Sequence, residues 1–243
     1  MAIKRYTANK DNTITNAFES NLTTRGTGSN MGLSDVLEIF SIYGQAQQPS
    51  SSLGSGSGDT TELSRILLEF PVSDINTDRS NETIPASGSV DFYLRLYNAR
   101  HGQTTPKEMT LVVAPVSRAW EEGIGLDMDE YKDLTRDHEG SNWMKSAGDT
   151  SWTTPGGDYL TASVITKTLE KGISSDGYTN YGIGVHLTGS QEAYFSSSTG
   201  DTTGSVLHNT DGAKRSYYTK KFFGRGTEFF FKKPTIEARW DSS

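Results

Sequence analysis

The stretch Ser89-Val-Asp-Phe-Tyr-Leu-Arg-Leu-Tyr-Asn98 indicates the fold class most directly, because apolar and polar residues alternate along it. Positions 90, 92, 94 and 96 carry Val, Phe, Leu and Leu, whereas positions 91, 93, 95 and 97 carry Asp, Tyr, Arg and Tyr. Successive side chains of a strand point to opposite faces of a sheet. The pattern therefore predicts a strand with one buried and one wet face, as is typical of antiparallel sheets.

Further strand patterns lie on both sides of this stretch. The segments expected to form strands are residues 1–8, 36–42, 65–70, 109–116, 161–169, 181–187, 217–223, 228–231 and 234–240. Helical patterns are short and are expected at residues 127–134 and 191–196. Because no long helix separates the strands, we predict an all-β fold: an antiparallel β-sandwich of the jelly-roll type with long loops and one or two short helices.

One domain is expected to span residues 1–243. A chain of 243 residues can bury a full core, and its 25 glycines and 7 prolines suit short strands joined by turns. Both ends are predicted to be strands of the same module, so we expect no attached catalytic domain, anchor or secretion signal. Residues 45–61 are rich in Gly and Ser, which predicts a flexible loop between paired strands.

The charge of the chain bears on its partners. Net charge is -7 and the pI is about 5.2, so the whole chain would repel nucleic-acid phosphates and anionic lipids. Basic and aromatic residues alternate at 214–223, which suits stacking of single strands but is also typical of a strand with one wet face. No segment has the ~20 apolar residues of a membrane-spanning helix. We expect neither nucleic acid nor membrane as a partner.

Residue types that carry catalysis show no productive spacing. The chain has no cysteine, which excludes disulfides, thiolate zinc sites and cysteine nucleophiles. Its histidines lie far apart in the sequence, at His101, His138, His186 and His208. The segment Gly54-Ser-Gly-Ser-Gly58 has the letters of a nucleophile elbow, but it lies in a low-complexity loop. We therefore predict a protein that is not an enzyme.

An acidic segment is the best candidate for ion chemistry. Its carboxylates are Glu121, Glu122, Asp127, Asp129, Glu130, Asp133, Asp137 and Glu139. Asp127 and Asp129 match the first two ligand positions of a calcium-binding loop, but Tyr131 and Lys132 replace a ligand and the required glycine. We expect a solvated acidic loop without a cofactor. The alternatives are a structural Ca²⁺ held by Asp127 and Asp129, or a carboxylate pair that cleaves a glycosidic bond.

Aromatic residues are candidates for sugar contact. Trp143, Trp152 and Tyr159 lie in a stretch rich in Gly, Ser and Thr, and exposed rings there would stack on carbohydrate. The alternative is that these rings cover one end of the sandwich. Trp120 and Trp240 lie in strand-like blocks, so we expect both in the core with a structural role.

Arg65 stands within an apolar strand and is expected to have a structural role too. An arginine in this position can pair with a carboxylate on a neighbouring strand or on its own strand. The candidates for this partner are Glu69, Glu38 and Asp91.

Blocks along nearly the whole chain resemble the DNRLRE-type β-sandwich, a jelly-roll module related to carbohydrate-binding modules. These blocks are residues 11–14, 30–39, 64–70, 116–123 with 151–156, and 233–240. Ser64-Arg-Ile-Leu-Leu-Glu-Phe70 resembles the arginine-bearing strand of that family, and Lys233-Pro-Thr-Ile-Glu-Ala-Arg-Trp240 resembles its terminal strand. The resemblance implies a jelly roll. Insertions at 45–61 and between the tryptophan blocks depart from the family pattern.

The opening, Met1-Ala-Ile-Lys-Arg-Tyr-Thr-Ala-Asn-Lys-Asp-Asn-Thr-Ile14, resembles virion structural proteins of marine tailed phages, including those of cyanobacteria. This resemblance implies a particle component, made in the host cytoplasm and released by lysis. The main hypothesis is a non-enzymatic decoration, neck, tail or fibre protein that binds other virion proteins and forms a homo-oligomer. The alternative is a carbohydrate-binding module that recognises host-surface glycans.

Overall fold

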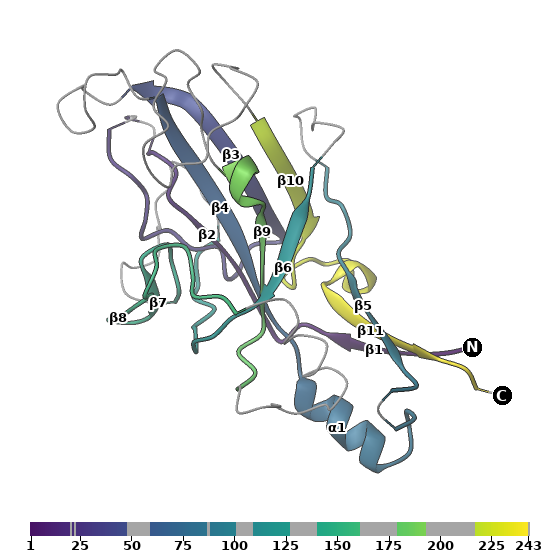
Figure 1. The fold of residues 1–243 in the computed structure, drawn as a ribbon. Coiled ribbons are helices and arrows are strands. Elements are labelled where there is room, and N and C mark those ends of the chain that lie inside the picture. Colours follow the sequence, from purple (N-terminus) through teal and green to yellow (C-terminus); the bar gives the residue numbers. More distant parts are fainter. Residues whose placement is uncertain are drawn as a thin grey trace.

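The computed structural model describes residues 1–19, 21, 23–47, 59–86, 88–100, 109–126, 140–160, 179–192 and 217–242 (Figure 1). In this part of the chain, antiparallel strands form a sandwich of two main sheets with a small hairpin beside it. The predicted all-β antiparallel sandwich is confirmed. The jelly-roll arrangement stays a prediction.

The smaller sheet brings the two ends of the chain together (Figure 1). Its strands lie in the order β1 (Ala2–Thr7), β11 (Thr235–Trp240) and β5 (Asp91–Arg95). Every pair is antiparallel, with Arg5 opposite Glu237 and Glu237 opposite Tyr93. The predicted strands at both termini and at residues 89–98 are confirmed.

The larger sheet forms the second layer. Its strands lie in the order β10 (Tyr217–Phe223), β3 (Val36–Gln47), β4 (Asp59–Glu69), β9 (Ile183–Leu187) and β6 (Leu111–Pro115). Strand β2 (Lys10–Thr15) pairs with the second half of β4. Because β3 extends to Gln47 and β4 begins at Asp59, both ends of the predicted loop at 45–61 are strand, and residues 48–58 lie outside the described residues.

The main core lies between the two sheets. The larger sheet contributes buried side chains that include Leu37, Ile66 and Leu187, and the smaller sheet contributes Tyr6 and Ile236. Residues 92, 94 and 96 pack against this core, whereas the alternate residues of β5 face outward. The alternation at residues 89–98 therefore assigned the buried face of that strand correctly.

A second apolar cluster covers the outward face of the larger sheet. Ile14 and Leu67 project from β2 and β4, and Trp120, Trp143 and Trp152 lie over them. The covering segment includes a hairpin of β7 (Lys145–Ala147) and β8 (Thr150–Ser151). This hairpin was not predicted from the sequence.

The described helices are α1 (Val72–Ser80), α3 (Gly189–Glu192) and the 3₁₀ turn η2 (Phe230–Lys232). Helix α1 was missed because only Val72 and Ile75 are buried, too few for a helical period to appear in the sequence. The predicted helix at 191–196 overlaps only the end of α3, and the predicted strand at 228–231 is wrong because η2 forms there. The expected helix at 127–134 and strand at 161–169 lie outside the described residues.

Within the described ranges, no helix is both long enough and apolar enough to cross a membrane.

Candidate binding surfaces

The two tryptophans predicted to contact carbohydrate are not on open surface. Trp143 and Trp152 are 6% and 5% exposed and belong to the cluster that covers the larger sheet. Trp152 also donates an indole hydrogen bond to the carbonyl of Asn142 at 2.8 Å. The two rings are therefore not exposed sugar contacts and serve as a cover, which agrees with the alternative interpretation. They cover the outward face of the larger sheet and not an end of the sandwich, because this sheet has a second apolar face.

Tyr159 is half-buried beside them. Its hydroxyl donates to the Gly156 carbonyl at 2.7 Å, and its ring lies 5.2 Å from the ring of His186. A Cβ at Gly184 would come within 2.1 Å of this ring, so a glycine is required there. Burial raises the pKa of Tyr159 to about 12. Tyr159 thus fills space against β9 rather than presenting a free face to a ligand.

Arg65 joins the covering segment to the sheet. It forms a bidentate pair with Glu192, with Nε to Oε1 at 3.0 Å and Nη2 to Oε2 at 2.6 Å, and Nη1 donates to the Gly156 carbonyl at 3.0 Å. Its guanidinium lies 5.2 Å from the centre of the Trp143 ring. The partner is therefore none of the three predicted carboxylates. Burial lowers the pKa of Arg65, but the hydrogen bonds and charge of Glu192, together with Tyr159, outweigh it, so the pKa is raised.

The tryptophans expected in the core differ in burial. Trp120 is 3% exposed, and its indole nitrogen donates to the Tyr181 carbonyl at 2.7 Å. Trp240 is half-buried at the end of β11, where it packs against the main core.

Glu122 has structural partners at the start of the acidic segment. Arg225 donates to it through Nε at 3.0 Å and Nη2 at 2.6 Å, and the Asp11 backbone N–H donates to it at 2.8 Å. Asp11 in turn accepts a short hydrogen bond from the Arg225 backbone N–H. Burial is the main cause that raises the pKa of Asp11 to about 7. Glu122 is thus held by an arginine rather than poised as a free base.

The predicted calcium ligands, Asp127 and Asp129, lie outside the described residues. The described residues that bracket them, Gly125 and Gly140, both pack against Asn30, whose Oδ1 accepts the Gly125 N–H at 2.8 Å. Among the described residues, no group of three or more His, Asp or Glu side chains is placed to hold a metal ion. The calcium site stays a prediction.

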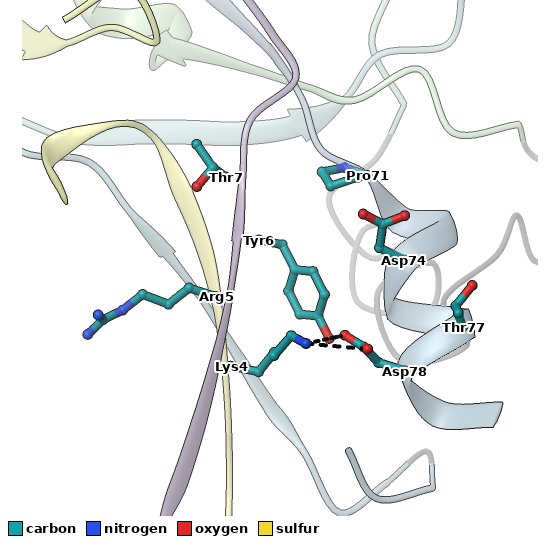
Figure 2. A pocket seen from close by; sticks show the side chains of 8 residues that line it. All are labelled: Lys4, Arg5, Tyr6, Thr7, Pro71, Asp74, Thr77 and Asp78. Atoms are coloured by element: carbon teal, nitrogen blue, oxygen red, sulfur yellow. Dashed lines mark hydrogen bonds and ion pairs between the residues drawn. The ribbon is translucent and has the colours of Figure 1, made fainter. Parts of the chain in front are cut away.

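An open groove of about 390 Å³ lies between β1 and α1 (Figure 2). Residues 4–7 form one wall, and Pro71, Asp74, Thr77 and Asp78 form the other. The Tyr6 hydroxyl donates to Asp78 at 2.7 Å, and Lys4 forms an ion pair with the same carboxylate at 3.1 Å. Burial and this hydrogen bond raise the pKa of Tyr6. These contacts join the strand to the helix across the groove.

Three arginines surround one carboxylate on the outward face of the smaller sheet. Glu237 has no exposed side-chain surface, and Arg5, Arg95 and Arg239 donate to it at 2.8, 2.5 and 2.6 Å. Hydrogen bonds from these arginines, first that of Arg5, lower the pKa of Glu237 to about 2. Tyr93 lies beside them, 45% exposed, with the Arg239 guanidinium 4.5 Å from its ring centre.

The 3₁₀ turn η2 displays the most exposed aromatic side chains among the described residues. Phe230 and Phe231 are 78% and 58% exposed, and Phe229 is 40% exposed. In a strand, three consecutive phenylalanines would place apolar rings on both faces. The run therefore argues against a strand with one wet face, and this signal could have identified an apolar surface there.

Comparison with models of known protein families finds no match, and no curated protein shows significant sequence similarity to the chain. The fold and these surfaces are therefore the basis for a functional assignment.

Proposed function

We propose that the protein is a non-enzymatic structural component of a phage particle, and that it acts by binding other virion proteins. The exposed phenylalanines of η2 carry this proposal. An aromatic side chain buries roughly 150–250 Å² when it enters an interface, and aromatic anchors supply much of the binding energy of protein contacts. Among the described residues, Phe230 and Phe231 are the most exposed aromatic side chains, at 78% and 58%.

Contacts around Phe229 fix the turn that carries these rings before any partner binds. Phe229 packs edge to face against Phe223 of β10, with ring centres 5.7 Å apart. The Lys232 ammonium lies 4.4 Å from the ring centres of both Phe223 and Phe229. Its backbone N–H donates to the Phe229 carbonyl at 2.7 Å. Such preorganisation favours affinity, because less conformational entropy is lost on binding.

Two further observations support the particle assignment. The opening residues 1–14 resemble those of phage virion proteins, and they supply β1 and β2 of the described sandwich. The net charge of -7 disfavours contact with nucleic acid.

The test is to purify particles from lysates of the host that produces the chain and to measure its copy number by mass spectrometry. We expect the unaltered chain in the particles and an at least tenfold lower copy number for the variant Phe230→Ser/Phe231→Ser. Met144→Ser is the matched control, because Met144 is an apolar residue of 44% exposure that lies outside both η2 and β1. Particles that lack the unaltered chain would overturn the proposal.

Glycan recognition is the second candidate, and the exposed ring of Tyr93 favours it. An aromatic ring beside arginines offers a stacking face together with hydrogen-bond donors for hydroxyl or carboxylate groups. This surface replaces Trp143 and Trp152 as the proposed aromatic contact. A glycan array probed with the unaltered chain and with Tyr93→Ala separates the two candidates. Binding that Tyr93→Ala abolishes would support this function, and a blank array would exclude it.

A further inference from the structure

Strand β1 has one free edge. Among the described residues it pairs with β11 on one side, and no strand pairs with its other side. Ala8 donates its N–H to the Pro234 carbonyl at 2.9 Å, so alternation directs the backbone groups of Lys4 and Tyr6 toward β11 as well. The backbone N–H and C=O groups of Ile3, Arg5 and Thr7 therefore point toward the free edge.

The groove of Figure 2 runs along this free edge. Its helical wall presents Asp74, Thr77 and Asp78, which lie three and four positions apart and share one face of α1. Because Tyr6 and Lys4 are bonded to Asp78, the helix is held beside the strand. A groove between an edge strand and a helix is a geometry that binds extended peptides by strand addition.

We propose that this groove binds an extended segment of a partner virion protein, which pairs with β1 as an added strand. The segment would form main-chain hydrogen bonds with Ile3, Arg5 and Thr7, and six residues would span the length of β1. The inference rests on the proposed function and names how one partner is bound.

Charge specifies the side chains of the partner strand. The Arg5 side chain points away from the groove (Figure 2). It is 60% exposed, and its Nε donates to Glu237. An acidic residue of the partner strand would lie beside it on the outward face. Asp74 lines the groove and is exposed, so the inward-facing neighbours would be basic or carry a hydroxyl.

A second copy of the chain is a poorer occupant. Antiparallel pairing of β1 with itself would place Lys4 and Arg5 close to the same residues of the other copy. Like charges directly opposite each other destabilise paired strands, and lysine on an edge strand disfavours such pairing. A partner strand with acidic residues on its outward face meets no such repulsion at Arg5.

The test is amide hydrogen exchange, measured with residue resolution on the chain in purified particles and on the free chain. We expect exchange at Ile3, Arg5 and Thr7 to be at least a hundredfold slower in particles. Chains that are present in particles but exchange these amides as fast as the free chain would overturn the inference and leave the proposed function intact. Equal protection in the concentrated free chain would assign the groove to a second copy and would overturn it too.

Two pairs of variants test the contacts separately. Thr7→Pro removes an N–H that points to the free edge, which an edge strand tolerates, whereas Thr7→Val keeps it. Asp74→Lys reverses a charge in the groove, whereas Ser73→Lys adds the same charge in the same turn of α1 outside the lining residues. We expect at least tenfold fewer copies per particle for the first member of each pair only. Equal incorporation within both pairs would contradict strand addition.

Discussion

The outward faces of the two sheets differ in what covers them. On the larger sheet, residues 116–126 and 140–160 lay Trp120, Trp143 and Trp152 over Ile14 and Leu67, and these rings are nearly inaccessible. On the smaller sheet, the outward face carries arginines and Tyr93 and has no covering segment among the described residues. Three of the four tryptophans are therefore buried in structural contacts, whereas Tyr93 and Arg5 on the smaller sheet stay exposed.

Each face also has an ion cluster with a shielded carboxylate. Arg65 and Glu192 are 16% and 11% exposed in their side chains, and aromatic rings shield them. Glu237 is shielded by its own arginines, of which Arg5 is 60% exposed. A buried pair is costly to disrupt, whereas an exposed arginine contributes little to stability. Replacing an exposed arginine on the open face should therefore change the stability of the fold only slightly.

The largest expected effect is on the covered face. Trp143→Ala should lower the free energy of unfolding by about 3–5 kcal/mol, because it removes a buried aromatic ring and leaves a cavity. Tyr93→Ala on the open face should cost less than about 1 kcal/mol, since the ring is 45% exposed. Urea unfolding of both variants measures the difference. Equal losses would mean that the two faces are equally buried in solution.

Removing an arginine should likewise destabilise the protein more on the covered face than on the open face. Arg65→Ala should destabilise by about 3 kcal/mol, because Glu192 is left with no counter-charge in a largely buried site. Arg5→Ala should cost less than about 1 kcal/mol, since Arg95 and Arg239 still donate to Glu237. Chemical denaturation measures both. A double variant Arg65→Ala/Glu192→Ala that is no more stable than Arg65→Ala would contradict the assigned pairing.

Two carboxylates, Glu237 and Asp11, should make the stability of the fold depend on pH in opposite directions. The pKa of Glu237 is lowered to about 2, so its ion pairs stabilise the fold above about pH 4.5, and this contribution is lost as pH falls toward 2. The pKa of Asp11 is raised to about 7. The protonated form is therefore favoured by folding, and stability decreases as pH rises from about 4 to 7.

Variants separate these two contributions in unfolding experiments from pH 2 to 8. Glu237→Gln should flatten the rise in stability between pH 2 and 4.5, and Asp11→Asn should flatten the decrease between pH 4 and 7, each by on the order of 1–2 kcal/mol. A decrease that persists unchanged in Asp11→Asn would assign it to other groups, of which Glu62 is the first candidate because burial raises its pKa.

The smallest expected effect on stability is at the proposed contact. Phe230→Ser should change the free energy of unfolding by less than about 0.5 kcal/mol, since the side chain is 78% exposed. Thermal unfolding measures this directly. A larger loss would show that the ring is packed within the folded chain, and would weaken its assignment as an anchor for a partner.

Local pattern predicted much of the fold. Alternation in residues 89–98 gave both the strand and its buried face, and the apolar run at 65–70 gave part of β4. Helix α1 gave only weak signals, such as Pro71 before it and Asp74 in its first turn, because tertiary contacts rather than an apolar period hold it in place. The strand predicted at 228–231 ignored the lack of alternation among three phenylalanines.

The candidate site depended on contacts between distant residues. Arg65 and Glu192 are separated by 127 positions, so no local pattern could pair them. The groove joins residues 4–7 to residues 71–78 and exists only once β1 and α1 pack together. The sequence showed where the tryptophans are, but it did not decide whether they cover a sheet or contact a ligand.

The period of two residues predicted the all-β class and the side of β5 that faces the core, because alternation is a local property of extended backbone. The tertiary structure alone decided which sheet face is covered, which carboxylate each arginine meets and which strand edge stays open. Those outcomes depend on which distant segments compete for the same apolar surface, and that competition is resolved only in the folded chain.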